Sequence, residues 1–466
     1  MAVSYLPRPS VDTAAPADGR QPRRYLVFAV VSVALFMASV DQTIVATALG
    51  TLQHDLHARV NWSSWTITIY ALGQILVMPL AGRVSDQHGR RRVFLCAVAL
   101  FTTASLCCGL ANDIYVLVAL RAVQAIGGGA FMPAATGIVS DQFGPDRDRA
   151  IGFFTSIFPI GGIVGPVLGG VFVTYWSWRG IFLVNVPIGI VLFGLALAFI
   201  PRTAKKTAGR IDVRGIALLG LGLLAVMFAI SSLGTAGSPW LVVMPLAIGL
   251  GGLAAFVRHS GRAADPFIPL RLLRGRGFAV MNLINFFFGV AVLGFATLVP
   301  LYAEERYGMP TLSAGTLLSA RAVGMIAVAG LTAFALRRTG YRRPMLAGFV
   351  LAALGLLLLA VPPVGLSDYL WLAVAAAVTG IGMGISVPAT NNAIMHLAPA
   401  DTGAVAGLRG MFRQAGGITG ISVVTAVIAR SSDPGLAQAW TLVVLAALLL
   451  CLLPLIWLVP EHRGSW

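Results

Sequence analysis

The sequence has few charged residues for its length. Only 11% of its 466 residues are Asp, Glu, Lys or Arg and 58% are hydrophobic, whereas a soluble domain carries about 25% charged residues. Acidic residues are the scarcer kind, 17 against 33 Lys and Arg. The basic residues form short clusters between long apolar runs, not one basic face with aromatic residues between them. This spacing excludes a nucleic-acid-binding protein and favours a membrane protein.

Residues suited to catalysis or metal binding are equally sparse. All four cysteines fall inside apolar runs, which leaves no disulfide framework and no metal-ligand spacing. His54 and His57 share one loop, where two imidazoles without a further ligand do not make a metal site. No phosphate-cradling Walker loop is present. We therefore expect no enzyme, no catalytic residues, no metal and no cofactor.

Fourteen apolar runs are long enough to cross a bilayer, which takes roughly 20 helical residues. They cover residues 25–49, 62–82, 93–111, 115–139, 150–173, 180–200, 213–233, 240–257, 278–302, 312–336, 344–361, 369–395, 403–429 and 437–459. This pattern predicts an all-α polytopic membrane protein. No loop between the runs is long enough for a catalytic domain, so any functional site lies within the helices.

The Lys and Arg residues outside the runs alternate from loop to loop. Loops after even-numbered runs and both ends of the chain hold nearly all of them, whereas the opposite loops hold only Arg59, Arg179, Arg306 and Arg430. Basic loops stay in the cytoplasm, and the Ala-, Gly- and Arg-rich composition is typical of a GC-rich bacterial genome. We expect a multi-pass protein of the bacterial inner membrane with both termini in the cytoplasm.

The loop after the second run places an acid beside a cationic cluster. Residues 82–92 read GRVSDQHGRRR, where Gly89 permits the positive φ of a tight turn. Asp86 can accept hydrogen bonds from an Arg fork or from a neighbouring helix N-terminus. The string resembles motif A of the major facilitator superfamily, whose implied role is a cytoplasmic latch between two halves of a transporter. The residues concerned are Gly82, Asp86, Gly89, Arg90 and Arg91.

The fourth run contains an arginine at membrane depth. Residues 121–129 read RAVQAIGGG, which resembles motif B of the same superfamily. A buried guanidinium is costly without a partner, and Asp41 is the only acid well inside the first run. Burial favours a protonated carboxyl group and an adjacent guanidinium favours an ionised one, a balance that allows proton exchange. We expect Asp41 and Arg121 to couple protons to transport; the alternative is a purely structural ion pair.

The fifth run combines small residues with a proline. Residues 161–170 read GGIVGPVLGG, a pattern that allows close helix approach and a kink. It resembles motif C, the antiporter motif, which is associated with exporters and not with uptake systems. The residues concerned are Gly161, Gly165, Pro166, Gly169 and Gly170. Ordinary helix packing also favours glycines, but the Gly-Pro placement favours export.

Three more strings resemble the fourteen-helix drug:proton antiporter family of this superfamily: WSWRGIFLVNVPIG at 176–189, IDVRG at 211–215 and MFRQAGG at 411–417. The resemblance implies the major facilitator fold, two six-helix pseudo-symmetric halves plus two additional helices. The expected parts are a disordered cytoplasmic tail (1–24), an N-terminal bundle (25–200), the two additional helices with linkers (201–276), a C-terminal bundle (277–460) and a cytoplasmic tail (461–466). A second motif A at 337–343 is decayed and lacks the acid.

The resemblance also implies a function. It is proton-coupled efflux of small amphiphilic molecules, drugs or antibiotics, by alternating access, driven by the proton gradient without a cofactor. The implied partners are a small-molecule substrate, protons and membrane lipid, with no nucleic acid, and we expect a functional monomer. The alternatives are a proton-coupled symporter for metabolite uptake and a transporter-derived membrane sensor.

Polar residues inside the runs are candidates for lining a central cavity. Tyr70 and Gln74 lie one helical turn apart and share a face. Asn or Gln in a membrane helix also often bonds to a neighbouring helix. The full candidate set is Gln42, Tyr70, Gln74, Gln124, Asn285, Asn391, Arg321, Arg413 and Gln414.

Basic residues, not acidic ones, enter the runs of the second half. Members of the family that export lipophilic cations often add membrane-embedded acids, and this chain departs from that pattern. Arg413 fits the family pattern and has a structural role as its alternative, whereas Arg321 and Arg409 are less usual. We expect a neutral to positive cavity that favours neutral, zwitterionic or anionic amphiphiles over dications. Since Arg409 lies one or two turns from a predicted helix end, we expect its guanidinium to extend to the inner interface.

Overall fold

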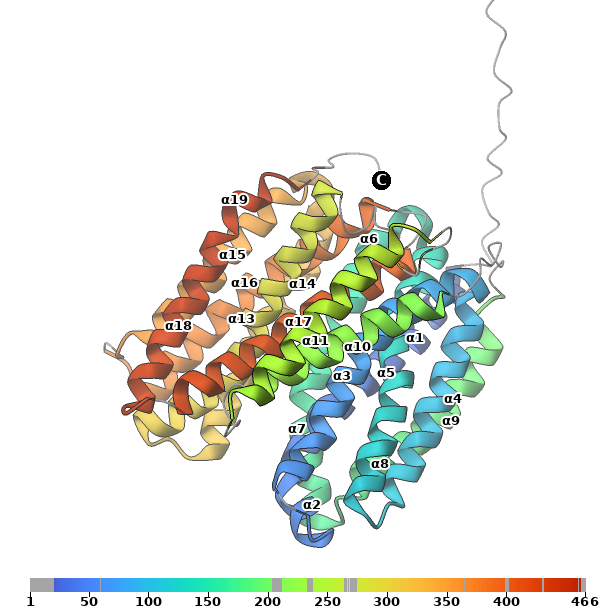
Figure 1. The fold of residues 1–466 in the computed structure, drawn as a ribbon. Coiled ribbons are helices and arrows are strands. Elements are labelled where there is room, and N and C mark those ends of the chain that lie inside the picture. Colours follow the sequence, from blue (N-terminus) through green and yellow to red (C-terminus); the bar gives the residue numbers. More distant parts are fainter. Residues whose placement is uncertain are drawn as a thin grey trace, which may run out of the picture.

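The computed structural model describes residues 21–58, 60–202, 212–232, 238–263, 266, 268, 275–363, 365–398, 402–429, 431–459 and 461. Within these residues every regular element is a helix. Figure 1 shows the helices of the N-terminal part of the chain gathered on one side of the molecule and those of the C-terminal part on the other. These two groups are called the N-terminal and C-terminal halves below.

The N-terminal half contains all six predicted spans. α1 (Gln21–Ile44) continues through η2 (Val45–Ala48) into α2 (Leu49–Asp55), followed by α3 (Val60–His88), α4 (Arg90–Gly109), α5 (Ile114–Phe143), η3 (Gly144–Asp146), α6 (Arg147–Thr155), α7 (Ile157–Tyr175), α8 (Gly180–Leu183) and α9 (Asn185–Phe199). The fifth and sixth spans are each interrupted once, at Ser156 and Val184. Since α1 begins at Gln21, residues 21–24 are helical and not part of the expected tail, whose remainder lies outside the described residues.

Two further helices join this half to the C-terminal half. They are α10 (Val213–Ser231) and α11 (Trp240–Ser260). The C-terminal half then contains α13 (Arg276–Tyr307), α14 (Thr311–Thr339), α15 (Arg342–Ala360), α16 (Asp368–His396), α17 (Thr402–Ala429), α18 (Pro434–Cys451) and α19 (Leu453–Ile456). Of the expected tail at 461–466, only Glu461 is among the described residues.

Thirteen helical segments of the described chain are long and apolar enough to cross a membrane. They correspond to every predicted run except 403–429. That run forms α17, which at 28 residues is also long enough to span a bilayer. α17 packs against α13 of its own half and against α3 and α5 of the other half. It is therefore an interior helix at the interface between the halves.

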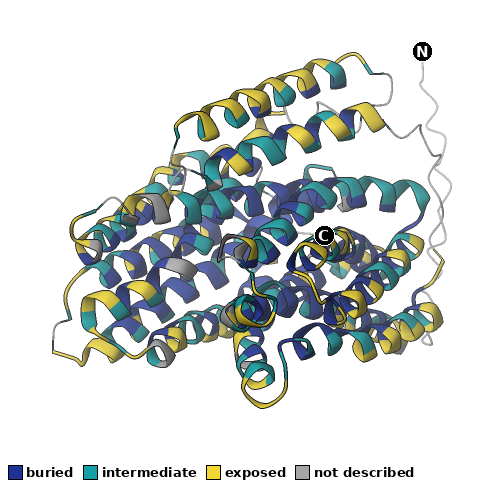
Figure 2. Cartoon of the chain, turned by 60° about the horizontal axis from the view of Figure 1, so that its bottom comes forward, coloured by how far each residue is buried: buried dark blue, intermediate teal, exposed yellow. Residues whose placement is uncertain are grey.

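Large apolar side chains cover the outside of the molecule. On α11, Leu241, Val243, Met244 and Ile248 are each more than half exposed, and Figure 2 shows exposed residues along the outer faces of the helices. A soluble protein does not expose apolar patches of this size. Lipid chains are as apolar as these side chains, so such a surface is suited to a bilayer.

The two halves meet along a limited set of helices. α3 and α5 pack against α17, α6 packs against α14 and α16, and α7 packs against α14. α10 lies at the same interface, in contact with α3 and α17. Side chains on these helices are therefore the ones that a rocking movement of the halves would separate or join.

Candidate functional site

A fully buried ion pair lies inside the N-terminal half. Asp41 of α1 and Arg121 of α5 are both 0% exposed, and Nη1 of the arginine lies 2.6 Å from Oδ2 of the carboxylate. The two residues predicted to form a pair are thus in direct contact at the same depth of the molecule. Their role in proton coupling stays a prediction.

Two amide side chains also donate to the carboxylate. Oδ1 of Asp41 accepts hydrogen bonds from Nε2 of Gln124 at 2.9 Å and from Nδ2 of Asn185 at 3.1 Å. Gln124 also accepts from Arg121 at 2.7 Å and donates to Ser105 at 2.7 Å. The carboxylate is therefore well partnered in this conformation. A displacement of α1 from α5 and α9 would separate the carboxylate from these donors.

The guanidinium of Arg121 is held by more than the acid. Its Nε donates to the carbonyl oxygen of Thr66 at 3.1 Å. Its Cζ lies 4.0 Å from the centroid of the Tyr70 ring and 5.6 Å from that of Phe182, so cation–π attraction adds to the ion pair. The structure thus places Tyr70, a cavity candidate, against the ion pair together with Gln124.

The sequence did not identify four members of this cluster, Asn185, Ser105, Phe182 and the carbonyl group of Thr66. Asn185 lies within the string at 176–189 that carried a family resemblance, and an Asn inside a membrane helix was itself a signal for a buried hydrogen bond. Ser105 and the backbone carbonyl of Thr66 gave no signal, because any residue has a carbonyl group and hydroxyl residues are common in membrane helices.

The glycines of residues 161–170 face two ways on α7. Gly161, Gly165 and Gly169 are buried against α1 and η2, and a Cβ atom on Gly161 would lie 2.6 Å from Cβ of Ser39. Gly162 and Gly170 face open space, and Pro166 is exposed. The buried glycine stripe therefore holds α7 tightly against the segment of α1 that carries Asp41.

The string at 82–92 is more helical than predicted. Gly82 is buried within α3, which continues to His88, so that Gly89 alone forms the turn before α4. Its φ of 97° lies in the region that favours glycine. Arg91 donates to the carbonyl oxygen of Leu197 in α9 at 2.6 Å.

Asp86 connects the two halves. Its Oδ1 accepts from Nε and Nη2 of Arg90 at 3.2 and 3.1 Å. Its Oδ2 accepts from the backbone N–H of Ala404, in the first turn of α17, at 3.1 Å. Arg90 in turn lies 2.6 Å from the carboxylate of Asp141 and donates to the carbonyl of Gly137 in α5. The acid thus accepts from both an arginine and the N-terminus of a helix in the opposite half.

A second polar contact between the halves comes from the decayed motif A. Arg337, in the last turn of α14, lies 2.8 Å from Asp146 of η3. The sequence pattern gave no reason to expect this contact, because the acid that partners Arg337 belongs to the other half of the chain.

Arg409 is enclosed at the interface between the halves. It is 1% exposed, donates through Nη1 to Oδ1 of Asn391, and places Nη2 3.9 Å from Sδ of Met132. Asn391 donates to Oγ1 of Thr155 at 2.9 Å. The expectation that the Arg409 guanidinium reaches the cytoplasmic surface of the membrane is wrong. α17 runs through the interior of the molecule, and residues of α5, α6 and α16 surround Arg409 there.

Arg321 and Arg413, the two arginines among the cavity candidates, also have no acidic partner among the described residues. Arg321 donates to the carbonyl of Val292 at 3.0 Å and lies 4.8 Å from the ring of Phe295. Arg413 lies 5.7 Å from the ring of Phe158, across the interface between the halves. Within the described part of the chain, none of Arg321, Arg409 and Arg413 forms an ion pair.

Of the remaining cavity candidates, Gln74 lies beside Tyr70 and the others are scattered. Asn285 donates to the carbonyl of Met281 on its own helix at 2.7 Å. Gln74 is buried against the glycines of α5, and Gln414 is buried on α17. Gln42 is partly buried on α1. The structure therefore brings Tyr70, Gln74 and Gln124 together beside Asp41 and Arg121, and Asn391 to Arg409, but does not gather the whole predicted set.

Solved structures show the same fold at low sequence identity. The human organic anion transporter MFSD10 (TETRAN) has a TM-score of 0.70 and 18% identity, covering 93% of this chain and 99% of its own. The proton:xylose symporter XylE has a TM-score of 0.67 and 13% identity, with 96% and 98% covered.

Curated relatives are similar over most of their length. The multidrug transporter protein MdtP of Bacillus subtilis is 30% identical over 89% of this chain and 77% of its own. The methylenomycin A resistance protein of Streptomyces coelicolor is 31% identical over 85% of this chain and 84% of its own.

The family model of the Major Facilitator Superfamily matches residues 31–421 and 281–466. Together with these relatives and the two-halved helical fold, this match shows that the chain belongs to the Major Facilitator Superfamily of transporters.

Proposed function

We propose that this protein exports small amphiphilic molecules, drugs or antibiotics, in exchange for protons. The observation that carries the proposal is the buried pair of Asp41 and Arg121, in a chain whose relatives include multidrug transporters and an antibiotic resistance protein. A fully buried carboxylate is costly and is a candidate for function wherever it occurs in a membrane. No cofactor is required, since the proton gradient supplies the free energy.

The coupling follows from the packing around Asp41. A proton added to this carboxyl group removes the charge that attracts Arg121 and weakens the hydrogen bonds from Gln124 and Asn185. α1 is then less tightly bound to α5 and α9, while its glycine contacts still join it to α7. α7 packs against α14 of the opposite half. Protonation thus loosens one side of α1 and lets α1 and α7 move together against the C-terminal half.

The proposed orientation places both termini and the basic loops in the cytoplasm. In that orientation, Asp86 with Ala404 and Arg337 with Asp146 lie on the cytoplasmic side and hold the halves together there. The conformation described is then closed toward the cytoplasm. We propose that the monomer is the functional unit.

Two arginines of α17 indicate the charge of the substrate. Arg409 and Arg413 lie one helical turn apart on α17 at the interface between the halves, and no carboxylate among the described residues pairs with either. An unneutralised positive charge on the substrate path repels a dication and attracts an anion. We therefore favour neutral, zwitterionic or anionic amphiphiles as substrates.

The test of coupling uses everted membrane vesicles with an acidified lumen. Adding substrate should release protons from vesicles that contain the wild-type protein. Asp41→Asn should abolish this release while the protein remains inserted, and Asp368→Asn, the same change at an exposed acid of α16, should leave it intact. Release that persists in Asp41→Asn would refute the proposed coupling.

The same measurement separates the alternatives. A proton symporter moves substrate and protons in the same direction. Substrate that enters the vesicles would then carry protons into the lumen and acidify it, whereas exchange makes the lumen less acidic. A sensor derived from a transporter would show no pH change with either protein. Efflux of a dicationic dye faster than that of a matched anionic or neutral amphiphile would refute the substrate class alone.

A further inference from the structure

A groove on the outer surface of the N-terminal half has a chemistry of its own. It has a volume of about 530 Å³ and lies between the start of α4 and the end of α9, two helices that pack side by side (Figure 1). None of its lining residues belongs to the Asp41 cluster or contacts Arg409. The ion-pair site and the interface between the halves therefore do not explain it.

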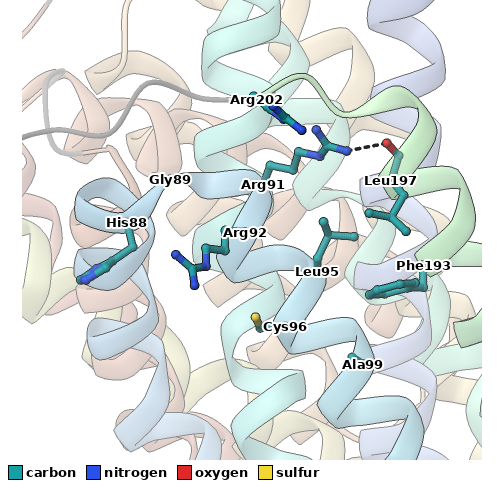
Figure 3. Close-up of a pocket in the computed structure, with 10 residues that line it drawn as sticks. All are labelled: His88, Gly89, Arg91, Arg92, Leu95, Cys96, Ala99, Phe193, Leu197 and Arg202. Atoms are coloured by element: carbon teal, nitrogen blue, oxygen red, sulfur yellow. Dashed lines mark hydrogen bonds between the residues drawn. The ribbon is translucent and has the colours of Figure 1, made fainter.

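One end of the groove is basic. His88, Arg91, Arg92 and Arg202 line this end, and no Asp or Glu is among the lining residues. Figure 3 shows these side chains gathered around the start of α4, with Arg91 fixed by its hydrogen bond to the carbonyl of Leu197. That bond uses one of the five N–H donors of a guanidinium. Arg92 and Arg202 are exposed. The end therefore offers several donors and a concentrated positive charge to an anion.

The other end of the groove is apolar. Leu95, Ala99, Phe193 and Leu197 line it, on the membrane-spanning parts of α4 and α9 (Figure 3). The spanning segment of α4 begins at Arg90 and that of α9 ends at Phe199. The basic end therefore lies at the membrane boundary and the apolar end at the depth of the hydrocarbon.

We propose that this α4–α9 groove binds an anionic phospholipid. The phosphate and acidic headgroup are held by Arg91, Arg92 and Arg202, and an acyl chain lies along Leu95 and Phe193. Basic pockets between membrane helices hold acidic headgroups by the same charge complementarity. A free phosphate ion would contact only the basic end and leave the apolar end unoccupied. A phospholipid has an anionic headgroup for the basic end and an acyl chain for the apolar end, and both lie at the depth that the groove requires.

Bound lipid also acts on the contact between the halves. Arg91 directly follows Arg90, which bonds to Asp86 and Asp141. A headgroup on Arg91 and Arg92 therefore fixes the first turn of α4 beside the acid that reaches α17. This inference depends on the membrane location of the chain and not on the direction or coupling of transport.

The experiment compares the double variant Arg92→Gln/Arg202→Gln with the control Arg258→Gln/Arg338→Gln. The control removes the same charge from exposed arginines outside the groove, and Arg91 is kept because its hydrogen bond joins two helices. The purified proteins are titrated with phosphatidylglycerol in detergent and bound lipid is counted by native mass spectrometry. The groove variant should bind phosphatidylglycerol about 30-fold more weakly than wild type, equivalent to about 2 kcal/mol for two arginines; the control should not change.

A thermal measurement checks the same proposal in the wild-type protein. Phosphatidylglycerol should raise the unfolding midpoint more than phosphatidylcholine does, and inorganic phosphate should not reproduce the increase. Equal effects of the two lipids, an equal effect of inorganic phosphate, or wild-type affinity in the groove variant would each overturn the proposal.

Discussion

At the scale of single residues, Asp41 and Arg121 are stable in the interior only together. Each charge is buried completely and each supplies the main partner of the other. Removing one member of a buried pair lowers the stability of a protein by about 3–5 kcal/mol, because the remaining charge has no partner. Replacing both members removes the pair and leaves no unpaired charge.

We therefore predict a non-additive double-mutant cycle. Arg121→Met should lower the thermal unfolding midpoint strongly, because Asp41 is left with only its amide donors Gln124 and Asn185. Adding Asp41→Asn to this variant should restore part of the loss. The midpoints of the two single variants and the double variant, measured in one detergent, provide the cycle. A double variant whose loss equals the sum of the single losses would show that the two charges are not coupled.

Arg409 should affect substrate choice more than stability. Its guanidinium lies at the interface between the halves and its described partners are Asn391 and Met132, with no acid. Replacing it by Gln removes a charged hydrogen-bond donor, worth about 1.5–3 kcal/mol. Arg409→Gln should therefore lower the transport of an anionic amphiphile by about 10-fold or more relative to a neutral one. The neutral substrate controls for folding and insertion, and an unchanged ratio of the two rates would contradict the assignment.

At the scale of helices, the contact between α1 and α7 depends on one face of α7. A Cβ atom on Gly161 would lie 2.6 Å from Cβ of Ser39, whereas a Cβ atom on the neighbouring Gly162 meets nothing within 4 Å. Both glycines lie in the same helix, so any loss due to the helical propensity of the new residue is the same at both positions.

Gly161→Val should therefore destabilise the protein while Gly162→Val should not. Overpacking a tight contact costs typically about 1–3 kcal/mol, and here it also displaces the segment of α1 that contains Asp41. We expect Gly161→Val to lower both the unfolding midpoint and proton exchange in vesicles. Similar midpoints for the two valine variants would show that α7 does not need close approach to α1.

These helices also show what the sequence could and could not predict. Hydrophobic length predicted the thirteen helical segments that are long and apolar enough to span a bilayer, because a bilayer imposes this length on the chain, and it predicted a fourteenth span where α17 lies. The same pattern does not indicate whether a span lies in the interior of the bundle or faces the lipid. The sequence thus predicted α17 as one span among others, whereas the structure shows it as an interior helix in contact with α3 and α5.

The sequence predicted the buried ion pair of the candidate site but not the contacts between the halves. Asp41 and Arg121 were found because each is costly alone and the first run offered only one acid. The burial of Arg409 and the contact of Arg337 with Asp146 depend on how the halves meet. Such contacts join residues far apart in the sequence, and no local pattern specifies them.

At the scale of the whole molecule, polar contacts of unequal strength join the halves in the described part of the chain, and besides the buried hydrogen bond from Asn391 to Thr155 these are the contacts of Asp86 and of Arg337. Asp86 accepts a charge-assisted hydrogen bond from the backbone of Ala404, at a helix N-terminus where negative charge is favourable. Its side chain is 8% exposed. Arg337 and Asp146 are 51% and 45% exposed, and exposed pairs contribute only about 0–1 kcal/mol. The conformational equilibrium should therefore respond mainly to Asp86.

We predict that Asp86→Asn separates the two halves at the end of the molecule where Asp86 contacts the first turn of α17. The amide cannot supply the charge that Arg90 and the N-terminus of α17 attract, and a loss of about 1.5–3 kcal/mol shifts the equilibrium between conformations by about 10-fold or more. Spin labels at Gln142 of α5 and Arg343 of α15, in a cysteine-free background, report the separation of the halves by pulsed electron paramagnetic resonance. Asp86→Asn should enrich the longer distance, whereas Arg337→Gln should change the distribution little. If the two variants give the same distribution, Asp86 is not the main contact that closes the halves, and the exposed pair contributes as much as the buried one.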